Sequence, residues 1–138
     1  MATPRPKRQR FTFLHLENWR NFTKVTVHLQ QRVFLIGPNA SGKSNFLDVF
    51  RFLYDIVSVG GGLQEAVRKR GGVSSLRSLA ARQNPDIVVH VLIGDDETQT
   101  AWEYELHFAQ DTQRRPLLRK ECVHHNGQLL LNRPDQQD

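Results

Sequence analysis

The sequence predicts an α/β fold in which a β-hairpin leads into a strand, a glycine-rich loop and a helix, with a strand-rich half after them. Three observations predict it. An apolar run over 32–36 enters a loop over 37–44, and a helical apolar pattern follows at once. Alternating apolar residues precede this unit over 11–29. Period-two alternation then returns over 87–131, which indicates antiparallel strands.

The first hairpin is predicted from a strand over 11–16, a turn over 17–22 and a second strand over 25–29. The prolines and basic side chains of 1–10 cannot build a core, so we expect a disordered basic tail there. The ordered domain is expected over 11–131. Residues 132–138 are polar and should form a second tail.

The loop over 37–44 has the pattern G-x-x-x-x-G-K-S, and the apolar run before it predicts a buried parallel strand. Gly37 and Gly42 allow backbone conformations that a Cβ would forbid, so that successive N–H groups can face a triphosphate. Lys43 supplies a charge for the β and γ phosphates, and Ser44 offers its hydroxyl to Mg²⁺. The expected ligand is therefore ATP with Mg²⁺, and a plain glycine turn is the alternative. The expected nucleotide-binding residues are Gly37, Pro38, Asn39, Ala40, Ser41, Gly42, Lys43, Ser44 and Asn45.

Apolar residues at helical spacing predict a helix after the loop, ending at the glycines of 60–62. A short basic helix is predicted over 63–70, with glycines at 71–72 to end it, and a helical turn over 74–81. The predicted buried stripe of the first helix is Phe46, Phe50, Leu53 and Val57, broadened by Leu47, Val49 and Ile56.

Two antiparallel hairpins are predicted in the second half. A polar loop over 94–100 joins the first pair of strands, and the turn dipeptide Asn126-Gly127 joins the second. The predicted strands span 87–93, 102–108, 120–125 and 128–131.

The 138 residues suffice for one domain, and the net charge of +5 is compatible with a nucleic-acid partner or with a mildly basic surface. The single cysteine, Cys122, excludes an internal disulfide. No apolar run has the length of a signal peptide or a membrane span, so we expect a soluble cytoplasmic protein. The basic residues cluster in 5–10, 68–70, 114–115 and 119–120.

Other chemistry-bearing residues give weaker signals. The segment 122–125 carries a thiol and two imidazoles, but alternation along a strand sends them to opposite faces, which favours a structural role over a metal site. Trp19 could stack a nucleotide base. Trp102 and Tyr104 have core-like spacing and are expected to pack in the core.

Two motifs, L-E-N-W-R-N-F over 16–22 and F-L-I-G-P-N-A-S-G-K-S-N-F-L-D over 34–48, with a third stretch over 61–76, resemble ABC-type ATPase heads of the SMC and RecF kind. They are still more similar to the bacterial AAA-family ATPases related to that group. The resemblance covers the chain from about residue 11 onward. It implies a P-loop NTPase, namely the N-terminal half of an ABC-type head, with its hairpin, Walker A strand and helix, and antiparallel β-subdomain.

The resemblance also implies roles for single residues. Arg20 is expected to contact phosphate or help to seat the nucleotide, with an exposed turn arginine as the alternative. Asn45 and Asp48 are usual in the family, and both could simply complement the helix dipole. Ala40 replaces the glycine common at that position, which should not abolish binding.

Hydrolysis in this class requires a Walker B acid, a signature loop from a second head and a switch histidine. The acids of 95–97 do not fit a Walker B strand, because Gly94 intervenes and the strand before it alternates. The chain therefore resembles the front half of a head, an ATPase only when a Walker B and signature half completes it. A truncation and one piece of a split enzyme both stay open.

The function implied by the resemblance is ATP binding, with head dimerisation on ATP and, in the complete form, action on DNA in repair or defence. The expected partners are ATP, the missing C-terminal half or a second head, and DNA as a further candidate. The alternative is a non-catalytic module that uses the P-loop as a scaffold and binds DNA or protein. A small nucleotide kinase is disfavoured, because a hairpin precedes the phosphate-loop strand.

Overall fold

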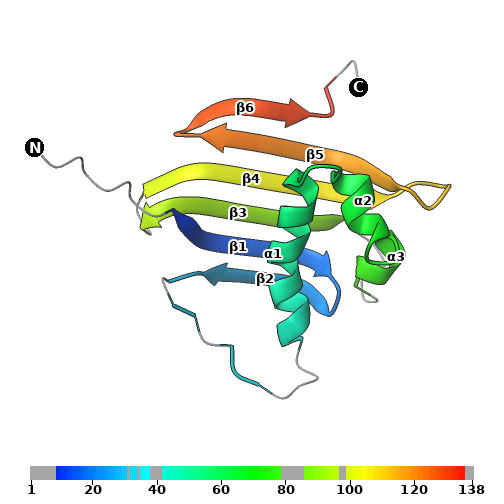
Figure 1. Ribbon diagram of the computed structural model, residues 1–138, viewed down its shortest axis with the longest axis horizontal. Helices are drawn as coiled ribbons and strands as arrows, with labels where there is room; N and C mark the ends of the chain where they lie inside the picture. The colour runs from blue at the N-terminus through cyan, green and yellow to red at the C-terminus, as the bar shows by residue number, and fades with distance from the viewer. Residues whose placement is uncertain are drawn as a thin grey trace, which may run out of the picture.

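The computed structural model describes residues 9–30, 32–33, 35–37, 42–78, 86–96 and 99–135. In this part of the chain, a six-stranded sheet carries three helices on one face (Figure 1). The strand order is β2-β1-β3-β4-β5-β6, and every neighbouring pair is antiparallel. The predicted hairpin, helix and antiparallel subdomain are confirmed. The elements are β1 (Arg10–Trp19), β2 (Phe22–His28), α1 (Lys43–Val57), α2 (Leu63–Arg68), α3 (Val73–Leu76), β3 (Ile87–Asp96), β4 (Gln99–Gln110), β5 (Pro116–His125) and β6 (Gln128–Arg133).

Most element boundaries lie within a few residues of their predicted places. Strand β1 begins at Arg10, inside the predicted tail, because Arg10 pairs with Gly94 of β3. The Arg10 guanidinium also donates to the carbonyl oxygen of Leu29 at 2.7 Å. Strand β6 continues to Arg133, which pairs with Glu121 of β5, so the predicted tail at 132–138 starts too early. Residues 1–8 and 136–138 of the two predicted tails, and 79–81 of the predicted helical turn, lie outside the described residues.

The two hairpins of the second half form where the sequence predicts them. Asn126 and Gly127 both have positive φ, 50° and 79°, as the type I′ turn requires. Asp95 and Asp96 belong to β3, which pairs antiparallel with β4. They therefore do not end a buried parallel strand, which is where a Walker B acid lies.

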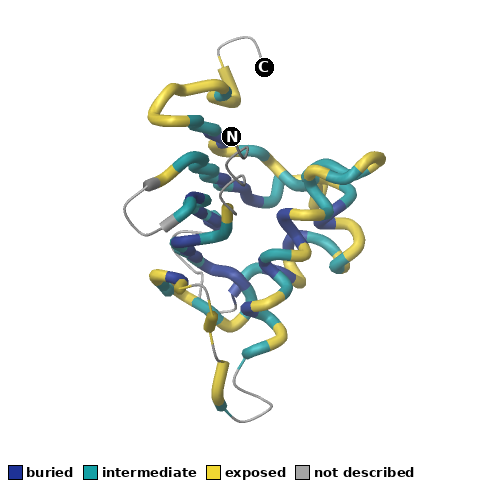
Figure 2. Tube along the Cα trace, turned by 60° about the vertical axis from the view of Figure 1, so that its left-hand side comes forward, coloured by how far each residue is buried: buried dark blue, intermediate teal, exposed yellow. Residues whose placement is uncertain are grey.

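The core lies between the inner face of the sheet and α1, which crosses the strands at a steep angle (Figure 1). Figure 2 shows the buried positions along both layers. The wholly buried ring of Phe52 packs on Trp19 and Phe108, with ring centroids 5.0 and 5.7 Å apart. Aromatic burial of this size is a large apolar contribution to stability.

The buried face of α1 differs from the predicted stripe. Phe46 and Leu53 are buried as predicted, but Phe52 belongs to the core and Val57 is 80% exposed. Val57 borders an apolar groove of about 680 Å³ between the end of α1 and the inner faces of β3–β6. Helical spacing shows which residues share a face, but only the neighbouring layer decides how far along the helix that face is covered.

In its described residues, the segment between β2 and α1 does not form the buried parallel strand that was predicted there. Residues 32–33 and 35–37 form no strand, and Val33, Leu35 and Ile36 are 47%, 38% and 92% exposed. In Figure 1 this segment runs away from the sheet, below β2. A strand buried on both faces needs parallel neighbours and a layer on each side. The described part of the chain provides no strand parallel to this segment, so its apolar side chains stay uncovered.

None of the described helices is long and apolar enough to cross a membrane.

Candidate functional site

The two ends of the glycine-rich loop meet in the structure. The Nζ atom of Lys43 donates a hydrogen bond to the carbonyl oxygen of Gly37 at 2.6 Å, although the two residues are six positions apart. The side chain of Lys43 therefore reaches back to the first residue of the loop. The predicted binding residues 38–41 lie outside the described residues.

Helix α1 begins directly after Gly42, whose φ of +90° suits glycine far better than any other residue. A Cβ atom at Gly42 would also lie 2.3 Å from Nδ2 of Asn21. Among the described residues no side chain caps α1, and its first turn carries no acidic residue. The positive end of the helix dipole, beside Lys43 and Ser44, is therefore not neutralised by a side chain and suits an anion.

The turn between β1 and β2 holds the start of α1 in place. The indole Nε1–H of Trp19 donates to the carbonyl oxygen of Asn45 at 2.8 Å, and the Asn45 amide donates to Oδ1 of Asn21 at 2.9 Å. Trp19 is fully buried. Its predicted stacking on a nucleotide base is therefore wrong, because the ring faces the core against Phe52.

Arg20 lies in the same turn with a left-handed φ of 50°. Its N–H donates to the carbonyl oxygen of Leu76 at 2.5 Å, which helps to offset the cost of this conformation. Its guanidinium donates to Asp48 at 3.0 Å and is 26% exposed, so the alternative of an exposed turn arginine does not hold. Its contact with phosphate stays a prediction.

Asp48 and Arg70 form an ion-pair network that the sequence did not predict. Nε and one terminal nitrogen of Arg70 donate to both Asp48 oxygens, at 2.9 and 3.1 Å, and the other terminal nitrogen donates to Asp55 at 2.8 Å. Asp48 therefore pairs with arginines, and it lies beyond the first turn of α1, where the helix dipole acts most strongly. The signal available in the sequence was the seven-residue spacing of Asp48 and Asp55, which places both on one helix face.

The network affects both partners' pKa values. Burial alone would raise the pKa of Asp48, but hydrogen bonds from Arg70 and Arg20 lower it below the usual range. Burial would lower the pKa of Arg70, and the two carboxylates raise it instead. Both groups are therefore ionised at neutral pH.

A hollow of about 770 Å³ lies beside α1 and reaches Ser44 and Asn45 at its start. Four cationic side chains outnumber two carboxylates on its walls, so the hollow favours an anionic ligand. These charged residues are Arg20, Arg51, Lys69 and Arg70 against Asp48 and Asp55.

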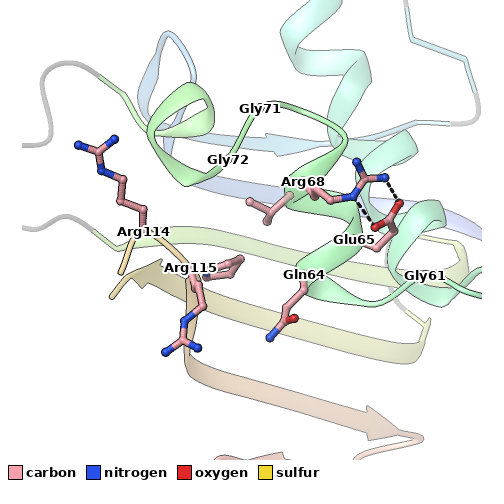
Figure 3. A pocket seen from close by; sticks show the side chains of 10 residues that line it. Gly61, Gln64, Glu65, Arg68, Gly71, Gly72, Arg114 and Arg115 are labelled. Atoms are coloured by element: carbon pink, nitrogen blue, oxygen red, sulfur yellow. Dashed lines mark hydrogen bonds and ion pairs between the residues drawn. The ribbon is translucent and has the colours of Figure 1, made fainter. Parts of the chain in front are cut away.

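A second cleft, of about 600 Å³, lies between α2 and the turn over 111–115 (Figure 3). On α2, Arg68 pairs with Glu65 at 2.6 Å. Arg114 and Arg115 extend from the opposite side, and Arg115 pairs with Asp111 at 3.0 Å. Arg114 has no ion-pair partner among the described residues.

The two imidazoles of the segment 122–125 alternate as predicted, and the structural role expected for the segment stays a prediction. His124 lies opposite Glu103, whereas His125 lies opposite Trp102 and stacks on its ring at 3.9 Å. The two imidazoles therefore face opposite sides of the sheet. Trp102 and Tyr104 are half-buried rather than central to the core, and the Tyr104 hydroxyl donates to Glu121 at 2.7 Å.

The glycine-rich loop and the helix that begins directly after it are features of a P-loop ATPase domain. Residues 32–131 match the family described as "AAA domain, putative AbiEii toxin, Type IV TA system". The chain belongs to this family. Over 46 residues, 33% of the chain, it is also 41% identical to Endonuclease GajA of Bacillus cereus (strain VD045), and this match covers 8% of GajA.

Solved structures share the fold. The recombination mediator RecF of the RecFOR pathway, in its ATPrS structure, matches 88% of this chain with a TM-score of 0.53 and 20% identity. A structure from work on ATP-driven dimerization and DNA-stimulated activation of SMC ATPases also matches 88%, with a TM-score of 0.53 and 16% identity. The chain spans 28% of the RecF chain and 72% of the SMC chain.

Proposed function

We propose that this chain binds Mg-ATP through the loop over 37–44 and contributes the Walker A side of an SMC/RecF-like ATPase head. The hydrogen bond from Lys43 to the carbonyl oxygen of Gly37 carries the proposal. It holds an ammonium group between the two ends of the loop, beside the positive end of α1. The cationic hollow next to Ser44 adds room for an anionic ligand. In this arrangement Ser44 would bind Mg²⁺, and Arg20 would help to seat the nucleotide.

Replacing Lys43 by alanine tests this proposal. We expect Mg-ATP affinity to fall about tenfold to hundredfold, because a hydrogen bond to a charged group is worth about 1.5–3 kcal/mol. Titration with a fluorescent ATP analogue, with and without Mg²⁺, measures the affinity. Circular dichroism and urea denaturation check that the fold is kept.

Lys24→Ala is the matched control, because Lys24 is an exposed lysine on β2, opposite Glu17 and away from the loop. It should bind Mg-ATP as the wild type does. A folded Lys43→Ala protein with wild-type affinity for Mg-ATP would overturn the proposal.

The names of the relatives support a further part of this proposal, which concerns the activity of the whole protein. RecF is a recombination mediator, the SMC work concerns dimerization driven by ATP and activation by DNA, and GajA is an endonuclease. We propose that the complete ATPase pairs two heads on ATP and acts on DNA in the cytoplasm, in repair or defence. Hydrolysis would then need the catalytic acid and signature loop from a further segment or a second head.

A second candidate function, a DNA-binding module that does not depend on ATP, is favoured by one observation. The cleft of Figure 3 carries three arginines, Arg68, Arg114 and Arg115, and the Arg114 guanidinium has no ion-pair partner in the described part of the chain. Guanidinium groups bind phosphates well, and their contacts weaken as salt rises.

DNA binding through this cleft predicts a specific mutant effect. Arg114→Ala should weaken binding of duplex DNA and lower the slope of log affinity against log salt by about one, because one phosphate contact is lost. Fluorescence anisotropy over a salt series, with and without ATP, measures both. Arg51→Ala, at the hollow beside α1, is the matched control. Equal effects of the two substitutions, or no DNA binding at all, would reject the cleft as a DNA site.

A further inference from the structure

The outer face of the sheet, opposite the helices, gathers the chain's histidines. Side chains on a strand alternate between faces, so the register shows which residues share one. Leu14 and Leu16 of β1 face the core, which puts His15 on the outer face, directly opposite His90 of β3. Five of the six histidines in the chain lie on this face by register, namely His15, His28, His90, His107 and His124.

Three of the outer-face side chains converge. A ring nitrogen of His90 and one carboxylate oxygen each of Glu103 and Glu105 all lie within 4.8 Å of one another. Nε2 of His90 is 2.8 Å from Oε1 of Glu103. The residues come from the paired strands β3 and β4 and are half-buried, so the backbone holds them in a fixed frame. Ligands at about 2.0–2.2 Å from one ion require only small side-chain rotations from this arrangement.

A neighbouring imidazole gives a second, independent observation. His124 of β5 lies opposite Glu103. Its Nδ1 atom is buried and has no hydrogen-bond partner among the described residues. Buried polar atoms without a partner are rare, and a bound ion nearby is one recognised explanation.

The carboxylate of Glu105 is already held in place. Nε2 of His107 lies 2.7 Å and Nζ of Lys120 lies 3.1 Å from its Oε1 atom. Outer contacts of this kind orient metal-binding side chains.

We propose that His90, Glu103 and Glu105 bind a divalent transition-metal ion such as Zn²⁺. An imidazole with two carboxylates suits Zn²⁺ and its neighbours in the first transition row, whereas Mg²⁺ prefers oxygen ligands alone. The site lies across the sheet from the P-loop helix. It is therefore separate from the Mg²⁺ that accompanies the nucleotide and does not depend on the proposed function.

Isothermal titration with Zn²⁺, in a nucleotide-free buffer, tests the proposal. The wild type should bind one equivalent, and excess Mg²⁺ should not compete. His90→Gln and Glu103→Gln should each weaken binding about tenfold or more, the size of loss seen when a metal site is disturbed. Zn²⁺ should also raise the urea midpoint of the wild type, reversibly with chelator, and leave that of His90→Gln unchanged.

His28→Gln is the matched control, because His28 lies on the same face but is exposed and packs on Phe13. It should bind Zn²⁺ as the wild type does. Glu103 has a 36% exposed side chain, so Glu103→Gln keeps the test valid if His90→Gln does not fold. Three results would each overturn the assignment: no saturable Zn²⁺ binding, equal losses of Zn²⁺ affinity in His28→Gln and His90→Gln, or a loss of affinity only in Cys122→Ser. The first result would leave the His90–Glu103 contact as an ordinary cross-strand pair.

Discussion

Replacing Arg70 with methionine is expected to lower the free energy of unfolding by about 3 kcal/mol. The Arg70 side chain is only 9% exposed, bridges Asp48 and Asp55 of α1, and lies over the Phe52 ring at 5.3 Å. Removing one partner of a buried ion pair leaves uncompensated charge and costs about 3–5 kcal/mol. The lower end applies because both carboxylates remain about one-fifth exposed. Urea denaturation followed by circular dichroism measures the change.

Arg68→Met is the matched control for Arg70→Met. Arg68 lies two positions earlier and also pairs with a carboxylate, Glu65, but its side chain is 73% exposed. Exposed ion pairs contribute about 0–1 kcal/mol, so this variant should keep nearly wild-type stability. Equal losses in the two variants would show that the Asp48–Arg70–Asp55 network contributes no more than a surface pair.

The same network makes the effect of Arg70→Met depend on pH. Because hydrogen bonds from Arg70 and Arg20 outweigh burial, the pKa of Asp48 is lower in the folded state than in the unfolded state. Its contribution is therefore present above the unfolded pKa of about 3.9 and is lost as pH falls through the folded pKa. The gap between wild type and Arg70→Met should shrink below about pH 4. A gap that stays constant down to about pH 3 would point to lost packing on Phe52 instead.

Replacing Trp19 with alanine is expected to have the second large effect, a loss of about 3–5 kcal/mol. The indole is fully buried, packs on Phe52 and donates to the carbonyl oxygen of Asn45. Alanine would leave a cavity and an acceptor without its donor. Trp19→Phe keeps most of the ring and should cost less, about 1–3 kcal/mol, chiefly for the lost hydrogen bond. Denaturant titration gives both values.

Trp102 provides the comparison for Trp19. It is half-buried and stacks on His125 at the end of the sheet, so Trp102→Phe should change stability little. In that background Trp19 is the one tryptophan left in the chain, and its fluorescence should report a buried indole that water-soluble quenchers do not reach. Trp19→Ala no more destabilising than Trp102→Ala would contradict its place in the core.

Local patterns predicted the parts of the fold that depend on local chemistry. Asn126-Gly127 predicted its hairpin because both positions need positive φ, and the alternation over 87–93 predicted a strand with one face in the core. The prediction of a buried strand over 32–36 was wrong for the residues that the structure describes there. The apolar composition of this segment indicates burial, but burial depends on neighbouring strands, and no pattern within the segment can show whether they are present.

At the site, the pattern identified the P-loop residues but not what surrounds them. Gly42, Lys43 and Ser44 follow from their spacing alone. Asn21 and Arg70 come from turns 21 and 28 positions away from Gly42, and nothing in their own neighbourhoods indicates that they contact α1. Long-range partners of this kind are fixed by topology, which periodicity does not encode.

Because of the hydrogen bonds between the β1–β2 turn and α1, the P-loop cannot be moved to another protein on its own. A peptide that starts at residue 32 would retain G-x-x-x-x-G-K-S but lose the indole and the amide that Trp19 and Asn21 contribute to the first turn of the helix. Grafting experiments, or minimal versions of this ATPase head, therefore have to carry the upstream hairpin with them.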